Sequence, residues 1–268
     1  MKDLIDLTQT TFIIPLKIEH EDRLNNVLCL LNYLNNNIQT NIIILETSNT
    51  HIAKLNQKTT PLSKYSNLKI KYLFRARERK FHRTKYLNQM LKQVSTPVVV
   101  NYDADVLLEI NTYKEAQRLI LNDIADFVYP YEWGQFQKNL HIGFAAEFKD
   151  SEFKLENIKE NYYTIANSEQ GHCVYAKTTS YISAGGENEE FISWGPEDKE
   201  RTFRFKTLGY NVIWMSGHYV YHQDHFRTSD SNTTNPQFQS NNSVFSKILA
   251  MTKEQTALYY KNKNFLRL

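Results

Sequence analysis

Two carboxylates separated by one residue, Asp103 and Asp105, follow directly after the apolar run Val98–Val100. In an open α/β sheet, ligands bind at the carboxyl ends of the strands, and this pair would lie at such an end. Carboxylate oxygens bind divalent cations, and a carboxylate can also accept a hydrogen bond from a ribose hydroxyl. A lone D-x-D pair often only begins a turn. Its position after a buried strand favours a metal site, in which one acid binds the metal and the other a ribose.

A second cluster surrounds Trp194, which is followed by Gly195, Pro196, Glu197 and Asp198. Proline suits the first turn of a helix, and acids near the helix N-terminus complement the positive end of its dipole. Pairs at i and i+4, Glu197 with Arg201 and Glu200 with Arg204, are expected on this helix. Helix stabilisation does not explain a tryptophan between a Gly-Gly turn and the acids, so Glu197 and Asp198 are candidate catalytic residues.

Three histidines, His218, His222 and His225, lie within eight residues. His218 and His222 would share one face of a strand, and neutral imidazole is a common ligand of manganese or zinc. A single histidine is more often a hydrogen-bonded polar group than a ligand, but three close together favour at least one ligand. A structural zinc site is a weaker alternative, because no cysteine lies nearby.

The elements that must position these residues are readable in the first 130 residues. Apolar, β-branched runs predict strands, and apolar residues at helical spacing predict helices. The predicted strands lie at 11–16, 41–46, 68–73, 97–102 and 126–129; the predicted helices lie at 21–34, 87–94 and 112–123, the last opened by a capping box at Thr112–Glu115. The alternation predicts an α/β fold with a mostly parallel central sheet and helices on both faces.

The second half of the chain has weaker periodicity. It predicts a strand at 172–176, a strong helix at 196–208, a Ser/Thr/Asn-rich loop and a terminal helix. We therefore divide the chain into one domain at 1–228, with a nucleotide-binding half at 1–130 and an acceptor-side, catalytic half at 131–228. Residues 229–242 are expected to form a mobile loop, and residues 243–268 a C-terminal helical extension.

The positions of the glycines exclude two kinds of nucleotide site. All eight glycines lie at or beyond Gly134, so the α/β half contains none. A Walker A loop and a G-x-G-x-x-G turn both need glycine where the backbone approaches phosphate. A nucleotide bound in this half would need another counter-charge, and a metal held by carboxylates is the obvious candidate.

Composition excludes further classes. The net charge of +3 in 268 residues gives no reason to expect nucleic acid as a partner, although the basic run 75–83 would suit a phosphate-bearing ligand or be a solvated stretch. The two cysteines, Cys29 and Cys173, imply no disulfide framework. The sequence has neither a signal-peptide pattern nor a run of about 18 apolar residues. We expect a cytoplasmic protein, with peripheral association with the inner face of the membrane as an alternative.

Taken together, these motifs resemble those of the GT-A glycosyltransferases, most closely the β-1,4-galactosyltransferase-like group and the related bacterial chondroitin-polymerase-type domains. The resemblance runs from residue 11 to residue 227. It rests on the opening strand at 12–15, on FHRTKYLN at 81–88, which is similar to the family's F-N-R-A-K-x-L-N segment, on the D-x-D motif at 103–105, on the block G-G-x-x-E-x-x-x-x-W-G-x-E-D at 185–198, and on His222 as a late metal-binding histidine. It implies the GT-A, Rossmann-like fold, with a smaller acceptor-side region and a C-terminal helix.

The resemblance also implies roles for individual residues. Asp105 and His222 would bind Mn²⁺ or Mg²⁺, with His218 as a further candidate, and Asp198 would be the catalytic base beside Glu197, which would hold sugar hydroxyls. The residues expected to contact the donor are Pro15, Lys17, Arg83, Asp103, Ala104, Gly186 and Trp194. Two positions depart from the family pattern: Tyr219 stands in place of a metal-binding methionine, which leaves the third ligand open, and Pro196 stands where glycine is usual.

The implied function is metal-dependent, inverting transfer of a hexose or N-acetylhexosamine from a UDP-sugar to a hydroxyl of a glycan or glycolipid acceptor. UDP-galactose and UDP-N-acetylgalactosamine are preferred to UDP-N-acetylglucosamine. Inversion is expected because related retaining enzymes tend to carry Asn at the position of Asp198. The helix N-terminus would lower the pKa of Asp198 while Glu197 and burial would raise it, and the sequence leaves that balance open.

Three alternatives remain: a retaining GT-A enzyme, a nucleotidyltransferase that makes sugar nucleotides, and a non-catalytic glycan-binding protein. The nucleotidyltransferase is disfavoured because the chain lacks a Gly-rich N-terminal loop. The sequence leaves the oligomeric state open.

Overall fold

The central feature of the computed structural model is a sheet that contains seven of the described strands, in the order β10-β6-β9-β4-β1-β2-β3. The structure describes residues 4–57, 61–150, 155, 162–164, 170–228 and 232–267. The strands of this sheet are β1 (Ile5–Lys17), β2 (Ile38–Thr47), β3 (Leu68–Arg75), β4 (Val98–Tyr102), β6 (Phe127–Tyr129), β9 (Cys173–Lys177) and β10 (Val212–Trp214).

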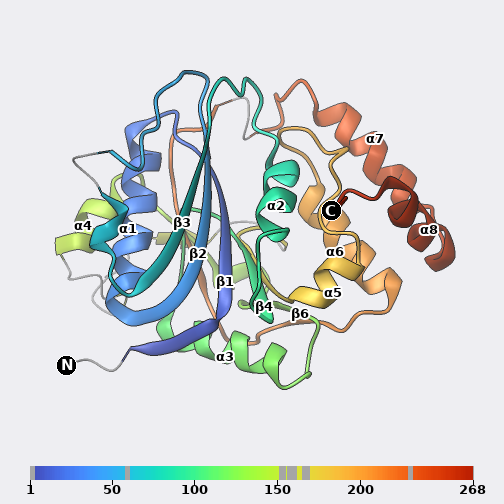
Figure 1. The fold of residues 1–268 in the computed structure, drawn as a ribbon, viewed down its shortest axis with the longest axis horizontal. Coiled ribbons are helices and arrows are strands. Elements are labelled where there is room, and N and C mark those ends of the chain that lie inside the picture. The colour runs from blue at the N-terminus through green and yellow to red at the C-terminus, as the bar shows by residue number, and fades with distance from the viewer. Residues whose placement is uncertain are drawn as a thin grey trace.

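The described helices are α1 (Glu21–Asn37), α2 (Arg83–Leu91), α3 (Ile110–Leu121), α4 (Phe144–Asp150), α5 (Thr178–Ser183), α6 (Glu197–Leu208), α7 (Phe238–Leu249) and α8 (Lys253–Lys263). Figure 1 shows α1 on one side of strands β1–β3 and α2 on the other, so helices cover both faces of the sheet. Burial on both faces explains why the inner strands are continuously apolar: Phe12, Ile13 and Ile14 are fully buried, as are Val98–Val100.

Most neighbouring strands of this sheet are parallel, which confirms the predicted sheet. The pairs β1–β2, β2–β3, β1–β4 and β6–β10 are parallel. Strand β9 is the exception, because it runs antiparallel to both β4 and β6. Its first residue, Cys173, pairs with Tyr102, and the carbonyl of His172 accepts a hydrogen bond of 2.9 Å from the Asp103 amide. The second half of the chain therefore meets the end of β4 where the D-x-D motif begins.

A smaller sheet has the order β5-β11-β7-β8 and is built from β5 (Val106–Leu108), β11 (Val220–Gln223), β7 (Gln137–Leu140) and β8 (Tyr162–Thr164). Strand β5 continues the chain directly after the D-x-D motif. It pairs antiparallel with β11, and His222 lies opposite Val106. This pairing brings residues about a hundred positions apart in the sequence to the same point.

Two local predictions are wrong. Helix α3 begins at Ile110 with Glu109 as its N-cap, and no side-chain hydrogen bond caps it. Thr112 is buried inside the helix and its Oγ1 lies 2.9 Å from Nδ1 of His218, so a tertiary contact takes the hydroxyl that the capping box needed.

The C-terminal prediction also needs correction. Residues 238–242, expected in a mobile loop, belong to α7, and two helices, α7 and α8, take the place of the single predicted helix. Residues 229–231 of the predicted loop lie outside the described residues. Both helices pack against α6 (Figure 1). None of the described helices combines the length and apolar character needed to cross a membrane.

Candidate active site and metal centre

A cleft of about 190 Å³ opens at the carboxyl ends of β1 and β4. Most of the site residues predicted from the sequence line it, although they come from five distant segments: Pro15, Lys17, Arg83, Asp103, Ala104, Asp105, Trp194, Glu197, Asp198 and His222. Residues that sequence reasoning gave no role also line it, among them Arg23, His225 and Arg227. The fold thus places the three chemically suggestive clusters on one surface.

Two predicted site residues lie elsewhere. Gly186 has a left-handed φ of +67°, and a Cβ added there would lie 2.6 Å from Oδ1 of Asn88. Its carbonyl accepts a hydrogen bond of 2.8 Å from Arg204. These contacts give Gly186 a role in a tight, buried turn. His218 precedes β11 and is hydrogen-bonded to Thr112, outside the group of side chains that could hold a metal ion.

That group consists of Asp105, His222 and His225, whose ligand atoms lie within 4.8 Å of one another. Nε2 of His222 lies 3.7 Å from Oδ1 of Asp105, and Nε2 of His225 lies 3.3 Å from Oδ2 of the same residue. All three side chains are largely buried. The amide of Gln223 donates a hydrogen bond of 2.8 Å to the carbonyl of Asp105, which fixes the two segments in register.

The hydrogen bonds of the two imidazoles decide which nitrogen is free to bind a metal. Nδ1 of His222 lies 2.7 Å from Oδ1 of Asn139, and Nδ1 of His225 lies 3.0 Å from the carbonyl of Phe226. Both partner oxygens only accept hydrogen bonds, so each Nδ1 must carry the proton and donate it. In a neutral ring the lone pair is then on Nε2, the nitrogen that faces Asp105. A hydrogen bond from the other ring nitrogen to an acceptor is typical of metal-binding histidines.

This arrangement fits a divalent cation. Two lone pairs and a carboxylate converge, and Oδ1 of Asp105 is buried without a hydrogen-bond partner among the described residues. Buried acceptors that face one another repel unless a cation lies between them. Burial lowers the pKa of His222, which favours the neutral form needed for metal binding. Burial opposes ionisation of Asp105, but the charge of the His222 and His225 rings when they are protonated, together with a hydrogen bond from His225, outweighs it and holds the pKa of this carboxyl below its usual range.

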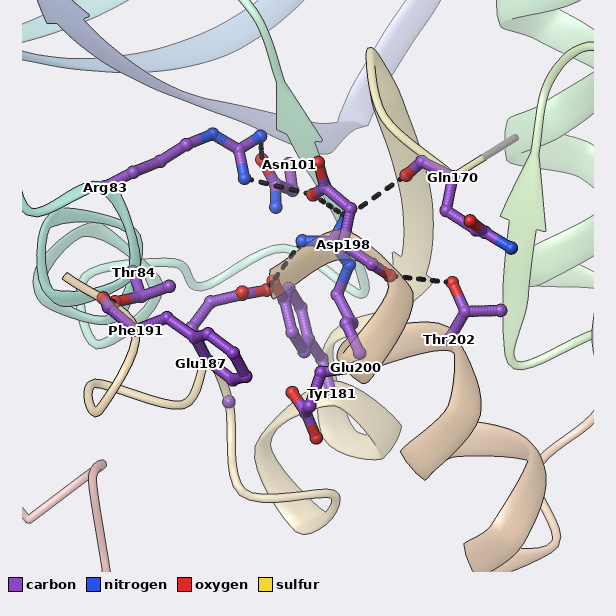
Figure 2. Close-up of polar contacts among 12 residues, drawn as sticks. Arg83, Thr84, Asn101, Gln170, Tyr181, Glu187, Phe191, Asp198, Glu200 and Thr202 are labelled. Carbon is purple, nitrogen blue, oxygen red and sulfur yellow. Dashed lines mark hydrogen bonds and ion pairs between the residues drawn. The ribbon is translucent and has the colours of Figure 1, made fainter. Parts of the chain in front are cut away.

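Arg83 joins the end of β4 to the N-terminus of α6. Its Nη2 lies 2.8 Å from Asp103 and 3.2 Å from the Asn101 side chain, and its Nη1 lies 3.2 Å from Asp198. Figure 2 shows Arg83 reaching from α2 towards Asn101 and Asp198. Burial disfavours the guanidinium charge, but Asp103 and Asp198 more than compensate and raise the pKa of Arg83. Burial also raises the pKa of Asp103, although Arg83 opposes that shift.

Asp198 is held by a second arginine, Arg201, whose Nη2 lies 2.6 Å from Oδ1. Arg83 contacts the same oxygen, and no described residue makes a hydrogen bond to Oδ2. Burial alone would raise the pKa of Asp198, but Arg83 and Arg201 lower it below the ordinary value. The balance left open by the sequence is therefore settled by two arginines, and this carboxyl is ionised at neutral pH.

The adjacent acid behaves in the opposite way. Glu197 is buried, and its Oε2 has no hydrogen-bond partner among the described residues. Burial and the neighbouring charge of Asp198 raise the pKa of Glu197 to about 8. Two consecutive carboxyls therefore have divergent pKa values, a pattern that marks acid and base assignments in active sites.

Charged residues behind the cleft form a buried network. The predicted pair of Glu200 and Arg204 is present at 2.9 Å, whereas Arg201 contacts Asp198 and, at 3.1 Å, Glu187 in place of the predicted Glu197. Arg201 and Arg204 are almost completely buried, so these pairs lie in the protein interior and not on a solvent-exposed helix surface. Removing one member of such a pair leaves the other charge buried without a partner, which destabilises the fold.

Two buried histidines carried no role in the sequence analysis. His225 lay within the recognised cluster but was assigned no ligand role. His172 is buried at the start of β9, has a left-handed φ of 67°, and its Nε2 has no hydrogen-bond partner among the described residues. Its ring centre lies 5.7 Å from that of His222. A single histidine before an antiparallel strand gives no sequence signal for such a position.

Comparisons with known proteins agree with this fold. No protein-family model and no curated protein sequence matches the chain. Among solved structures, residues 1–349 of S. aureus TarS in complex with UDP-GlcNAc are similar, with 13% identity, a TM-score of 0.60, and coverage of 96% of this chain and 72% of that one.

Two further structures are similar over 96% of this chain. GalNAc-T7 with UDP, GalNAc and Mn²⁺ has 11% identity, a TM-score of 0.59 and 50% of its chain covered. The mannosyltransferase PcManGT from Pyrobaculum calidifontis, in complex with GDP-Man and Mn²⁺, has 12% identity, a TM-score of 0.53 and 69% of its chain covered. At such low identity the likeness concerns the fold. Together with the mixed α/β sheet described above, it shows that this chain has the GT-A fold.

Proposed function

We propose that the protein is a metal-dependent glycosyltransferase that moves a hexose or N-acetylhexosamine from a UDP-sugar to a hydroxyl of a glycan or glycolipid. The observation that carries the proposal is the convergence of Asp105, His222 and His225 in the same cleft as Asp198. A nucleotide- or glycan-binding protein would need no metal ligands beside an ionised carboxylate.

Asp105, His222 and His225 would hold Mn²⁺ or Mg²⁺, with water and donor oxygens completing the coordination. When bound, the cation would supply positive charge to the diphosphate, on which negative charge accumulates as it leaves. Mixed imidazole and carboxylate ligands suit manganese. The complexes of GalNAc-T7 and PcManGT with Mn²⁺ support this choice.

Basic residues along the cleft would orient the donor. Arg23 and Arg227 line it near the metal centre, and Lys17 lies 3.1 Å from Glu19 at the end of β1. Because Arg83 is already paired with two acids, we assign it mainly to positioning Asp103 and Asp198. Asp103 would bind the ribose, and Trp194 would line the sugar pocket.

Asp198 would act as the general base. Both arginines contact Oδ1, which leaves Oδ2 to accept the proton of the acceptor hydroxyl. As the oxygen of the acceptor hydroxyl forms a bond to the anomeric carbon, the bond from this carbon to the diphosphate oxygen breaks, and the electron pair leaves with the diphosphate. Attack from the opposite face would invert the anomeric configuration. The lowered pKa makes Asp198 a weak base, but it also keeps this carboxyl in the deprotonated form that accepts a proton.

The experiment is a screen of nucleotide sugars for release of the nucleoside diphosphate, in the presence of Mn²⁺, Mg²⁺ or a chelator. UDP-galactose, UDP-N-acetylgalactosamine, UDP-N-acetylglucosamine and GDP-mannose should be included, because the neighbours carry UDP-GlcNAc, UDP with GalNAc, and GDP-Man. We expect chelator-sensitive turnover of a UDP-sugar. Turnover that is unaffected by chelator, or absent with every donor, would contradict the proposal. Product of retained configuration would replace the inverting mechanism with a retaining one.

A further inference from the structure

The loop that carries Trp194 contains a strained residue. Ser193 has a φ of +60°, in the left-handed region that non-glycine residues rarely adopt. It is buried and, like Trp194, lines the cleft. Backbone strain of this kind persists only where surrounding contacts hold it, and it is often found at functional sites. The contacts that hold Ser193 come from the C-terminal region.

Asn241 on α7 binds the loop on both sides of Ser193. Its Nδ2 donates to the carbonyls of Ile192 and Trp194, each at 2.9 Å, and its Oδ1 accepts from the Ile192 amide at 3.2 Å. Asn241 is 1% exposed, so water cannot replace these bonds without a rearrangement of the packing. One side chain thus fixes the backbone immediately before and after the strained residue.

Two neighbours of Asn241 hold the side chains of the same loop. Nδ2 of the buried Asn235 donates to Oγ of Ser193 at 2.7 Å. The ring of Phe238 stacks on the indole of Trp194, with centroids 5.2 Å apart and an angle of 27° between the planes. Side chains from residues 235–241 therefore fix the positions of the loop backbone, of the Ser193 hydroxyl and of the Trp194 indole.

Gly195 shows that this fit leaves no spare volume. A Cβ added to Gly195 would lie 2.7 Å from both Cβ and Nδ2 of Asn241. The loop approaches α7 so closely that only glycine is accommodated opposite the asparagine. The contact is therefore a packed interface and more than a chance polar pair.

We propose that Asn241 is a positioning residue, which with Asn235 and Phe238 keeps Trp194 oriented towards the substrate in the cleft. The C-terminal extension is then part of the active site, although none of these three residues lines the cleft itself. The effect of these three residues on catalysis rests on the proposed function, whereas their effect on the position of Trp194 can be measured without any assumption about function.

The test compares Asn241→Ala with Asn242→Ala. Asn242 is a matched control because it is on the same helix, and its side chain bonds only to the Phe238 carbonyl, within α7, among the described residues. Both changes are made in a protein with Trp133→Phe and Trp214→Phe, so that Trp194 is the only tryptophan and can be excited selectively over the tyrosines. Acrylamide quenching then reports the exposure of Trp194, and turnover of the best UDP-sugar reports catalysis.

We expect Asn241→Ala to increase the quenching constant about twofold and to lower kcat/KM at least about tenfold, because small misplacements near reacting groups are costly. Asn242→Ala should change neither. Phe238→Leu, which keeps Asn241, covers the case in which Asn241→Ala fails to fold, and it should also increase quenching. Unchanged quenching in the folded variants would overturn the proposal. If the parent protein turned over no donor, the proposed function would fail. The quenching measurement would still decide whether Asn241 holds Trp194 in position.

Discussion

The two sides of the cleft handle buried charge in opposite ways. On one side, Asp103 and Asp198 are neutralised by Arg83 and Arg201, which the chain itself supplies. On the other, Asp105 faces Nε2 of His222 and of His225, which carry no proton when the rings are neutral. The first arrangement is complete in the protein alone, whereas the second would be completed by the proposed cation. Substitutions on the two sides should therefore have different consequences.

The largest effect is expected on the metal side. His222→Ala removes a ligand, and we expect turnover to fall about 10³-fold or more, because the charge supplied to the leaving diphosphate is lost. Binding of Mn²⁺ measured by calorimetry should weaken in parallel. His218→Ala is the matched control, since His218 lies outside the metal group, and it should retain both properties. Equal losses in the two variants would show that His222 has no special part in metal binding.

A smaller loss, with a different signature, is expected on the arginine side. Asp198→Asn keeps the size of the side chain but removes the base, so turnover should drop about 10²-fold while binding of the donor and of Mn²⁺ stays near that of the wild type. Steady-state kinetics and calorimetry measure the two separately. A variant that kept more than about a tenth of the wild-type rate would exclude Asp198 as the base.

The smallest effect concerns stability and pH. The pKa of Glu197 is raised from 4.5 to about 8, so between these values the folded protein binds a proton that the unfolded chain has lost. Stability contributed by this protonated carboxyl is present below the lower value and declines as the pH rises towards the upper one. Glu197→Gln removes this contribution, and urea unfolding across that range should show a weaker fall in stability than the wild type. An unchanged pH dependence would mean that Glu197 is ionised in the folded state.

Much of the cleft could be predicted because its residues follow strong local patterns. Asp103 and Asp105 come directly after a fully apolar strand, and the carboxyl end of a buried parallel strand is where ligands bind. The alternation of strands and helices predicted the mostly parallel sheet, and the family resemblance of the three motifs placed Asp198 and His222 near the D-x-D pair. The structure brings them into one cleft.

The third member of the candidate metal group, His225, was missed for a geometrical reason. Strand alternation favours His218 and His222, which are an even number of residues apart, but β11 begins only at Val220 and ends at Gln223. His218 therefore precedes the strand, whereas His225 follows it, and its Nε2 lies 3.3 Å from Oδ2 of Asp105. The bounds of a four-residue strand are not readable from periodicity.

The first residues of α7, 238–242, were taken for a loop because their polar side chains have weak helix propensity. The structure explains why they are there: Asn241 makes its hydrogen bonds to another part of the chain, and these tertiary contacts outweigh local preference. Similarly, Thr112 looked like a helix cap, but its hydroxyl is bonded to His218. Local rules fail where a side chain has a distant partner.

The antiparallel strand β9 has a consequence for how the chain reaches its native state. It lies between β4 and β6, so among the described strands β6 and β10 join the rest of the sheet only through residues 173–177. A nascent chain that ended before β9 would leave one edge of β4 without a partner and would have no place for β6. Assembly of the sheet must therefore wait for a pairing between residues more than seventy positions apart, which slows folding and exposes a bare strand edge in the meantime.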